Sequence, residues 1–155
     1  MTENYPEDYH AELLSYVNLE AEQRILEIGM NLWSQEPDNF AKRLKHVVDV
    51  DRQASLLIAE HNETSEIAGF LVVRHFINLR KTVGSVEDFV VDPAYRRLGI
   101  GRLLMQFAEY SLRQRGCESI EITSQPTREA AHRLYESLGY QKHDIDVFHK
   151  TLRTT

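Results

Sequence analysis

The hydrophobic and polar positions of the chain follow two spacings, one typical of strands and one typical of helices. Residues 55–60 and 67–76 are β-rich runs that flank a polar stretch, so they predict a β-hairpin. Residues 98–115 instead repeat apolar side chains at helical spacing, and Gly116 stands where a helix commonly ends. The chain therefore mixes both kinds of element.

The same patterns along the whole chain predict strands and helices in mixed order. Strands are expected at residues 12–17, 55–60, 67–76, 83–91, 119–124 and 146–152, and helices at residues 20–33, 39–48, 98–115 and 127–138. This order predicts an α/β fold of three layers, a central mixed β-sheet of about six to seven strands flanked by about four helices. No repeat or long linker interrupts the 155 residues, so a single domain is expected over residues 1–155.

A glycine-punctuated turn follows the strand predicted at residues 83–91. An Asp-Pro pair breaks that strand, and the pattern Arg96-x-x-Gly99-x-Gly101 then leads into the next helix. Where a strand leads directly into a helix in this way, the free backbone N–H groups of the first helical turn and the positive end of the helix dipole lie at the same point. This arrangement predicts a site for phosphate or pyrophosphate.

Two other phosphate-binding motifs do not fit this turn. A P-loop needs Gly-Lys-Ser/Thr, whereas Gly101 is followed by Arg102 and Leu103. The dinucleotide fingerprint needs a third glycine, and Leu104 occupies that position.

The residues around the turn resemble the GNAT superfamily of acyl-CoA-dependent N-acyltransferases. The stretch Arg-Arg-Leu-Gly-Ile-Gly at 96–101 is similar to that family's pyrophosphate loop, and residues 91–95 resemble its usual lead-in. Residues 130–140 resemble the family's Ala-x-x-Leu-Tyr-Glu-x-Leu-Gly-Phe helix, with Tyr140 in place of the commoner Phe. The resemblance covers roughly residues 55–152 and implies the same three-layer fold.

The resemblance also implies how acetyl-CoA, the expected co-substrate, would bind. The pantetheine arm would pair with the backbone of Phe89, Val90 and Val91 as an added strand, and an amide there would donate to the thioester carbonyl oxygen. Arg128 is a further expected phosphate contact, at a position where the family often has Asn. The pyrophosphate loop itself comprises Arg96, Arg97, Leu98, Gly99, Ile100, Gly101 and Arg102.

Glu87 is the candidate general base. A lysine-like amine with a pKa near 10.4 is almost fully protonated at pH 7, and a carboxylate must remove that proton before the amine can attack. Glu87 lies four residues before Val91, where many members of the resembled family place this glutamate. In a regular strand Glu87 and Asp88 face opposite sides, and a bulge would change which one faces the cleft. A solvated or ion-paired position is the alternative for Glu87, and Glu121 is then the next candidate base.

Tyr135 is the candidate partner of the leaving thiolate. A thiol pKa near 8.5 lies below a tyrosine pKa near 10, so complete proton transfer from tyrosine would be uphill by roughly 2 kcal/mol. A hydrogen bond from the hydroxyl to the developing thiolate avoids that cost. The alternative is a core tyrosine on the helix face that it shares with Ala131 and Leu138.

Composition narrows the expected partners and location. With 24 acidic and 18 basic residues, the formal net charge is −6, which disfavours nucleic acid and mildly favours a cationic amine. The chain has no apolar run long enough for a bilayer, and its polar, acidic N-terminus is unlike a signal peptide, so a cytoplasmic protein without membrane attachment is expected. Cys117, the single cysteine, fits a reducing compartment, and the histidines show no metal-ligand spacing on a helix face, so no metal is expected. The sequence leaves homodimer formation open.

The sequence therefore predicts an acetyl-CoA-dependent N-acetyltransferase in which a primary amine, on a small molecule or a protein, attacks directly in a ternary complex. The alternative is a catalytically silent domain that binds acyl-CoA as a sensor or interaction module. Both need the loop, and only the enzyme needs Glu87 and Tyr135. The helices between residues 20 and 48 are expected to wall the acceptor site, with Trp33 and Phe40 as candidate lining or as core.

Overall fold

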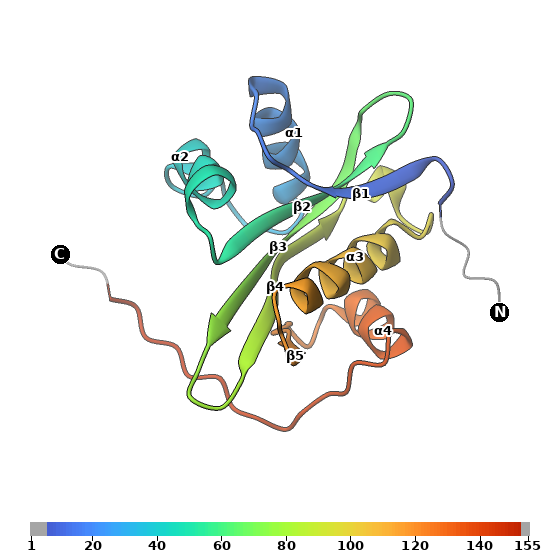
Figure 1. Cartoon of the computed structure of the whole chain (residues 1–155). Helices are drawn as coiled ribbons and strands as arrows, with labels where there is room; N and C mark the ends of the chain where they lie inside the picture. The colour runs from blue at the N-terminus through green and yellow to red at the C-terminus, as the bar shows by residue number, and fades with distance from the viewer. Residues whose placement is uncertain (1–5, 153–155) are drawn as a thin grey trace. The chain divides into compact units, whose positions relative to one another are not determined.

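The computed structural model describes residues 6–152 in two units, residues 6–123 and 124–152. The first unit contains a five-stranded sheet of β1 (Tyr9–Leu13), β2 (Ala54–His61), β3 (Ile67–Ile77), β4 (Thr82–Val91) and β5 (Ser119–Glu121). It also contains the helices α1 (Leu19–Gly29), α2 (Phe40–Lys45) and α3 (Ile100–Gln114) (Figure 1), a short π-helix at His46–Val50 and a short 3-10 helix at Pro93–Tyr95. The second unit contains α4 (Glu129–Ser137). The single domain expected over residues 1–155 stays a prediction.

The sheet is mixed, as the sequence predicts. Its strand order is β1-β2-β3-β4-β5, and the first four strands pair antiparallel with their neighbours. β5 pairs parallel to β4, but only along Val83–Ser85 of β4. The α/β class is thus confirmed, and β4 continues for six residues beyond the end of its ladder with β5.

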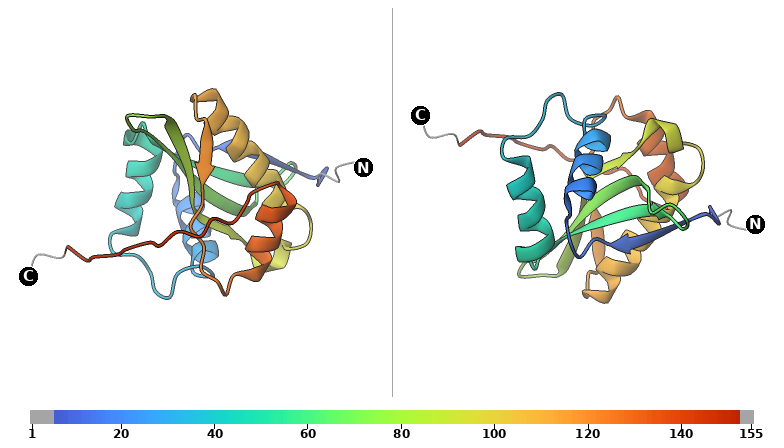
Figure 2. Two further views of the ribbon diagram at one scale, coloured as in Figure 1. Left: turned by 90° about the horizontal axis from the view of Figure 1, so that it is seen from below. Right: turned by 90° about the horizontal axis from the view of Figure 1, so that it is seen from above.

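Helices cover both faces of the sheet within residues 6–123. α1 and α2 lie side by side on one face, where Ile25, Ile28, Phe40 and Leu44 join Phe70 in the buried core (Figure 2). α3 packs on the other face, with its apolar residues Leu104, Met105, Ala108 and Leu112 fully buried. The three layers predicted from the alternation of strands and helices are therefore present in this unit.

Elements near the N-terminus begin and end earlier than the sequence pattern predicts. β1 occupies residues 9–13 rather than 12–17, because its register pairs Tyr9 with His61 and the ladder closes near Leu14, whose amide donates to the carbonyl of Leu56 at 3.0 Å. α1 ends at Gly29 rather than at residue 33. A Cβ at Gly29 would lie 2.2 Å from the ring of Trp33, so the chain turns back after this glycine and lays the indole on the helix.

The strand expected at residues 146–152 is absent, so the sheet has five strands and not six to seven. Residues 141–152 have no regular secondary structure, and Val147, Phe148 and Leu152 are 72%, 92% and 84% exposed. Alternating apolar residues predict a strand only where a neighbouring strand accepts the backbone hydrogen bonds. In the described residues no ladder includes this segment, and the prediction was wrong here for that reason.

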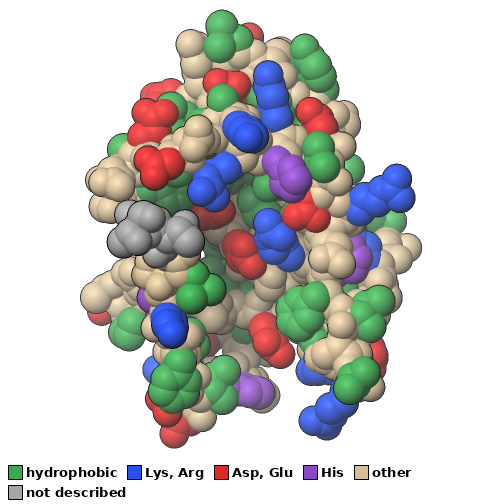
Figure 3. Space-filling model, turned by 90° about the vertical axis from the view of Figure 1, so that its left-hand side faces the viewer, with side chains coloured by type: hydrophobic (Ala, Val, Ile, Leu, Met, Phe, Trp, Pro, Cys, Tyr) green, Lys and Arg blue, Asp and Glu red, His purple; other side chains and the backbone are tan. Residues whose placement is uncertain are grey.

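The surface carries both signs of charge. On the face in Figure 3, Lys and Arg side chains are interspersed with Asp and Glu side chains. Neither sign forms a continuous field on that face. Within residues 6–152, no helix combines the length and the apolar character needed to cross a lipid bilayer.

Candidate active site

A β-bulge in β4 brings two carboxylates to the same side of the sheet. Val72 of β3 pairs with Glu87 and Phe70 pairs with Val90, so Leu71 stands opposite two residues of β4. Asp88 occupies the left-handed region with a φ of 48°, as the extra residue of a bulge can. The regular alternation would have turned Asp88 away from Glu87. Instead both side chains are exposed toward the α1–α2 face, which is where Val72 and Phe70 pack.

Glu87 is held in place but remains open to solvent. Its Oε1 accepts a hydrogen bond from the Ser85 hydroxyl at 3.2 Å, and its Oε2 lies 3.4 Å from Nε of Arg74. Arg74 also contacts Asp51 at 3.1 Å, and the pKa of Asp51 is lowered, first by the backbone amide of Gln53 and further by this guanidinium. The side chains of Glu87 and Arg74 are 48% and 40% exposed, so the ion pair is screened and leaves the carboxylate accessible to a proton. The structure shows the ion-paired, partly solvated position of Glu87, and its role as a base stays a prediction.

Asp88 contacts the edge of a cluster of aromatic side chains. The indole Nε1 of Trp33 donates to Oδ1 of Asp88 at 3.2 Å. The Trp33 ring lies 5.7 Å from that of Phe40 and 6.2 Å from that of Phe70. Phe40 is buried and Trp33 is half-buried, so Phe40 belongs to the core and Trp33 presents an edge beside the carboxylate.

Glu121 is on the same side of the sheet. It pairs with Ser85 in the parallel β4–β5 ladder, and Ser85 is two residues before Glu87 in β4. Side chains two apart on a strand, and those of direct cross-strand neighbours, share a face. The structure therefore keeps Glu87, Asp88 and Glu121 as alternative bases.

The edge of β4 beyond Ser85 presents backbone groups on the side away from β3. The amide of Asp92 donates to Ala68 at 2.9 Å, toward β3, so the amide and carbonyl of Val91 point to the opposite edge. Arg96 reaches back to this edge, with its Nε 3.4 Å from the carbonyl oxygen of Val91. No other described strand pairs with residues 86–91 on that side.

The loop after β4 has the geometry of an anion cradle. Arg97 and Gly99 both have positive φ, 67° and 86°, and Gly99 caps α3 without any side-chain hydrogen bond. The first bond within the helix runs from the Leu103 amide to the Gly99 carbonyl at 3.0 Å. The amides of Gly99, Ile100 and Gly101 precede it at the positive end of the helix dipole. Alternation of left-handed and other backbone conformations also directs successive backbone N–H groups into one concavity.

Arg128 and Tyr135 belong to the second unit, residues 124–152. Arg128 caps the start of α4, and Tyr135 lies on that helix with only 8% of its surface exposed. Burial raises the pKa of the Tyr135 hydroxyl, while Arg128 acts in the opposite direction. The Tyr135 ring lies 6.0 Å from that of Tyr140, whose amide donates to the Tyr135 carbonyl at 3.0 Å. The two candidates therefore lie within electrostatic reach of one another.

Comparison with known proteins agrees with this geometry. Residues 11–140 match the model of the acetyltransferase (GNAT) family. The chain belongs to the GNAT family. The relatives include a glucosamine 6-phosphate N-acetyltransferase from Trypanosoma brucei brucei, 31% identical over 117 residues, which cover 72% of this chain and 77% of that protein. An aminoalkylphosphonate N-acetyltransferase from Salmonella typhimurium is 32% identical over 107 residues, 68% of this chain and 65% of that protein.

Solved structures share the fold. AAC(6')-Iy in complex with a bisubstrate analog that contains CoA superposes with a TM-score of 0.77 at 15% identity, covering 92% of this chain and 97% of that one. Family membership confirms the predicted enzyme class, an acetyl-CoA-dependent N-acetyltransferase. The GNAT family uses acetyl-CoA, and this structural neighbour is in complex with an analog that contains CoA.

Contacts between distant residues support the site, and the sequence did not reveal them. Arg24 of α1 donates from Nη2 to Oδ2 of Asp92 at 2.6 Å and from Nε to the carbonyl of Ile67 at 3.0 Å. The other carboxylate oxygen of Asp92 accepts from the Ala94 amide at 2.8 Å and so caps the turn that precedes the loop. Burial lowers the pKa of Arg24, but its hydrogen bonds to Glu27 and Asp92 outweigh that effect and raise it. Arg24 thus connects α1, through Asp92, to the turn that precedes the cradle.

Replacing Arg24 with methionine is expected to lower the free energy of unfolding by about 2 kcal/mol, or roughly 4–8 °C in Tm, because the Asp92 carboxylate would lose its charged partner. Both side chains are only 17% and 15% exposed, so water replaces the lost bond poorly. Differential scanning calorimetry checks the value. Arg133→Met is the matched control, since it removes the exposed Arg133–Glu129 pair and should change stability by less than about 0.5 kcal/mol. Equal effects of the two substitutions would contradict the role of Arg24.

Proposed function

We propose that this chain transfers the acetyl group of acetyl-CoA to a primary amine of a small molecule, by direct attack of the amine within a ternary complex. The observation that carries the proposal is β4. A bulge presents Glu87 and Asp88 on one side of this strand, its outer edge carries the backbone groups of Val91, and the cradle follows immediately. An acceptor amine, a thioester and a pyrophosphate can therefore be placed along one strand.

In the proposed complex, acetyl-CoA is bound more by backbone groups than by side chains. The edge formed by Phe89, Val90 and Val91 would pair with the pantetheine arm as a further strand. An amide in this stretch would donate to the thioester carbonyl oxygen, and a preorganised donor of this kind contributes roughly 3 kcal/mol of transition-state stabilisation. The pyrophosphate would lie on the loop of Arg96, Arg97, Leu98, Gly99, Ile100, Gly101 and Arg102, with Arg128 as a further contact.

Glu87 is proposed as the general base. The amine must lose a proton before it attacks, and Glu87 can accept this proton directly or through one water molecule. The N–C bond then forms as the C–S bond breaks, and the electron pair of that bond leaves on the thiolate sulfur. Tyr135 would donate a hydrogen bond to this sulfur. Burial raises its pKa, so the hydroxyl stays protonated at neutral pH and is able to donate.

Asp88 and Trp33 are proposed to bind the acceptor. A carboxylate beside an indole edge attracts a cationic amine through charge and through the ring face. Two named relatives act on amino sugars or aminoalkylphosphonates, which are small molecules with a primary amine. These names favour a small molecule over a protein amino group, and the carboxylates on one face of β4 favour an acceptor whose amine is protonated before it reacts.

Glu87→Gln should lower turnover about 100-fold at pH 7 and much less at pH 9.5, where a larger share of the amine is already unprotonated. The amide keeps the size of the side chain, so acetyl-CoA affinity should not change. A pH–rate profile for each variant measures this. Asp88→Asn and Glu121→Gln are the matched controls. The variant that loses its activity at neutral pH and recovers it at high pH identifies the base.

The function itself is tested by thiol release from acetyl-CoA. Purified full-length protein is incubated with acetyl-CoA and, separately, an amino sugar phosphate, an aminoalkylphosphonate, an aminoglycoside, a polyamine and a lysine-containing peptide. Release that depends on one of the small amines is expected. Calorimetric binding of acetyl-CoA with no release for any acceptor would instead favour the catalytically silent acyl-CoA-binding module, and release with the peptide alone would contradict the small-molecule acceptor.

A further inference from the structure

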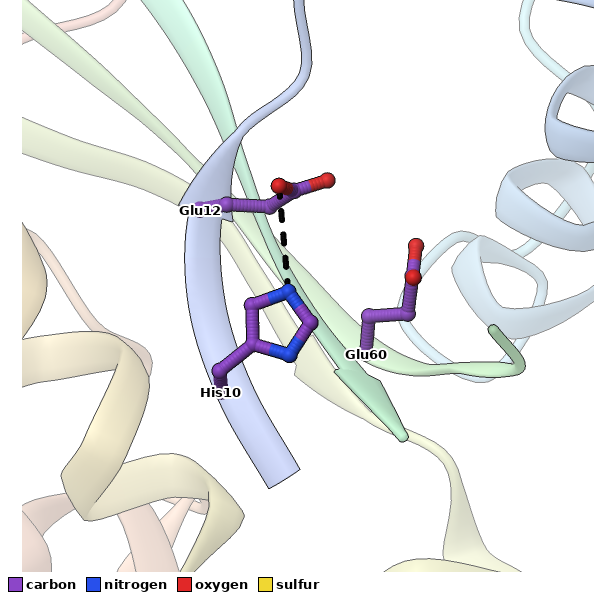
Figure 4. Close-up of side chains that lie close together, drawn as sticks. All are labelled: His10, Glu12 and Glu60. Carbon is purple, nitrogen blue, oxygen red and sulfur yellow. Dashed lines mark ion pairs between the residues drawn. The ribbon is translucent and has the colours of Figure 1, made fainter. Parts of the chain in front are cut away.

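Three side chains with metal-ligand atoms meet on the first two strands. His10 pairs directly with Glu60 across the β1–β2 ladder, and Glu12 lies two residues after His10, so all three share one face of the sheet. Their nearest nitrogen and oxygen atoms lie within 4.8 Å of one another (Figure 4). Nε2 of His10 is 3.7 Å from Oε2 of Glu12, and both side chains are about half exposed.

A fourth residue fixes which nitrogen of His10 carries a proton. Asn62 donates from Nδ2 to the carbonyl of Glu7 at 2.8 Å, and its amide donates to the carbonyl of Asp8 at 2.8 Å. These bonds turn Oδ1 of Asn62 toward His10, where it lies 2.8 Å from Nδ1. Because an amide oxygen only accepts, Nδ1 of His10 must be the protonated nitrogen. The lone pair of Nε2 in the neutral ring is therefore available on the side of Oε2 of Glu12, 3.7 Å away, and the carboxylate of Glu60 lies near both residues.

A ring nitrogen beside two carboxylates favours a cation at this point of the sheet. A ring lone pair facing two carboxylates is electrostatically unfavourable unless a cation lies between them. The histidine itself can supply a proton, or a metal ion can bind. A histidine that donates its second nitrogen to an oxygen while the first is aimed at carboxylates is the arrangement of a metal ligand with a supporting hydrogen bond.

We propose that His10, Glu12 and Glu60 bind a divalent transition-metal ion of the Zn²⁺ type. Zn–N and Zn–O bonds of about 2.0–2.2 Å place tetrahedral ligand atoms roughly 3.4 Å apart, close to the 3.7 Å between His10 and Glu12. The carboxylates of Glu12 and the half-buried Glu60 would have to rotate to close the remaining distance. Ca²⁺ would require six to eight oxygen ligands, and Mg²⁺ prefers oxygen ligands and water, so one imidazole among three ligands favours zinc.

The ion would act on the fold and not on the acetyl transfer. β1 is an edge strand, and the site joins it to β2. β4, which carries the candidate catalytic carboxylates, lies two strands further along the sheet from β2. The proposal is therefore independent of the proposed function. Histidine spacing along a helix does not reveal this site, because its ligands come together only across a pair of strands.

Isothermal titration of the untagged, full-length protein with ZnCl₂ tests the proposal. We expect one zinc ion per chain, a loss of affinity of at least 100-fold in His10→Gln, and a loss of about 10-fold in Asn62→Ala, which removes only the supporting hydrogen bond. His46→Gln, which replaces an exposed histidine of the π-helix, is the matched control and should bind zinc like the parent protein. ¹⁵N chemical shifts of the imidazole provide a second readout, since only Nε2 of His10 should respond to zinc.

Three results would overturn the proposal. The first is that the folded parent protein does not bind zinc, so that His10 and Glu12 form only their ion pair. The second is that His10→Gln binds zinc as well as the parent protein does, which would place the ion elsewhere. The third is that Mg²⁺ displaces zinc at equal concentration, which would mean that the site is an acidic patch without a role for the imidazole.

Discussion

Gly101→Glu is expected to weaken acetyl-CoA binding at least about 100-fold while the protein stays folded. Gly101 is the second residue of α3, in the turn whose amides precede the first intrahelical hydrogen bond. A carboxylate there would repel the pyrophosphate and could accept the same N–H groups. Isothermal titration with acetyl-CoA measures the loss.

The same substitution should raise the stability of the free protein by about 1 kcal/mol. Glutamate has a higher helix propensity than glycine, and its charge interacts favourably with the N-terminal end of a helix dipole. Stability and affinity are thus predicted to change in opposite directions, which a general folding defect could not produce. Gln114→Glu, at the exposed end of the same helix, adds an equal charge without touching the loop and should leave the affinity unchanged. Unchanged affinity in folded Gly101→Glu would remove the cradle from the proposed site.

The cradle was predictable from the sequence because its determinants are local. The left-handed φ at Gly99 is adopted at least cost by a residue without Cβ, and the strand, the break and the helix are contiguous in the chain. The hairpin of β2 and β3 and the amphipathic helix α3 were predictable for the same reason. In each case the spacing of apolar residues within one segment decides the element.

The arrangement of the carboxylates was not predictable, because it depends on pairing between strands. Whether Asp88 joins Glu87 on one face is decided by the register of β3 against β4. The contact of Arg24 with Asp92 joins residues far apart in the sequence, as does the cluster of His10 with Glu60. The absent strand at residues 146–152 illustrates the converse, since a suitable pattern has no effect without a partner strand.

Tyr135 differs from the candidate carboxylates because its side chain is buried, which raises the pKa of its hydroxyl. A tyrosine whose pKa is raised in the folded state favours folding at every pH below about 10, and this contribution is lost only as the pH rises through the higher, folded-state value. The hydroxyl is therefore protonated throughout the range in which an amine acetyltransferase is assayed. Any effect of removing it should then be independent of pH up to about 9.5.

Tyr135→Phe is expected to lower kcat about 100-fold, with little change in acetyl-CoA affinity and a loss of stability of at most about 1 kcal/mol. Phenylalanine keeps the ring and its packing against Tyr140, so the hydroxyl is the group under test. Single-turnover kinetics on an accepted amine, compared with thermal unfolding, measures the two effects. Tyr110→Phe, which removes an exposed hydroxyl from α3, should change neither. Normal kcat in Tyr135→Phe would assign Tyr135 to the core, and the thiolate would then leave with help from water or from the N-terminus of a helix.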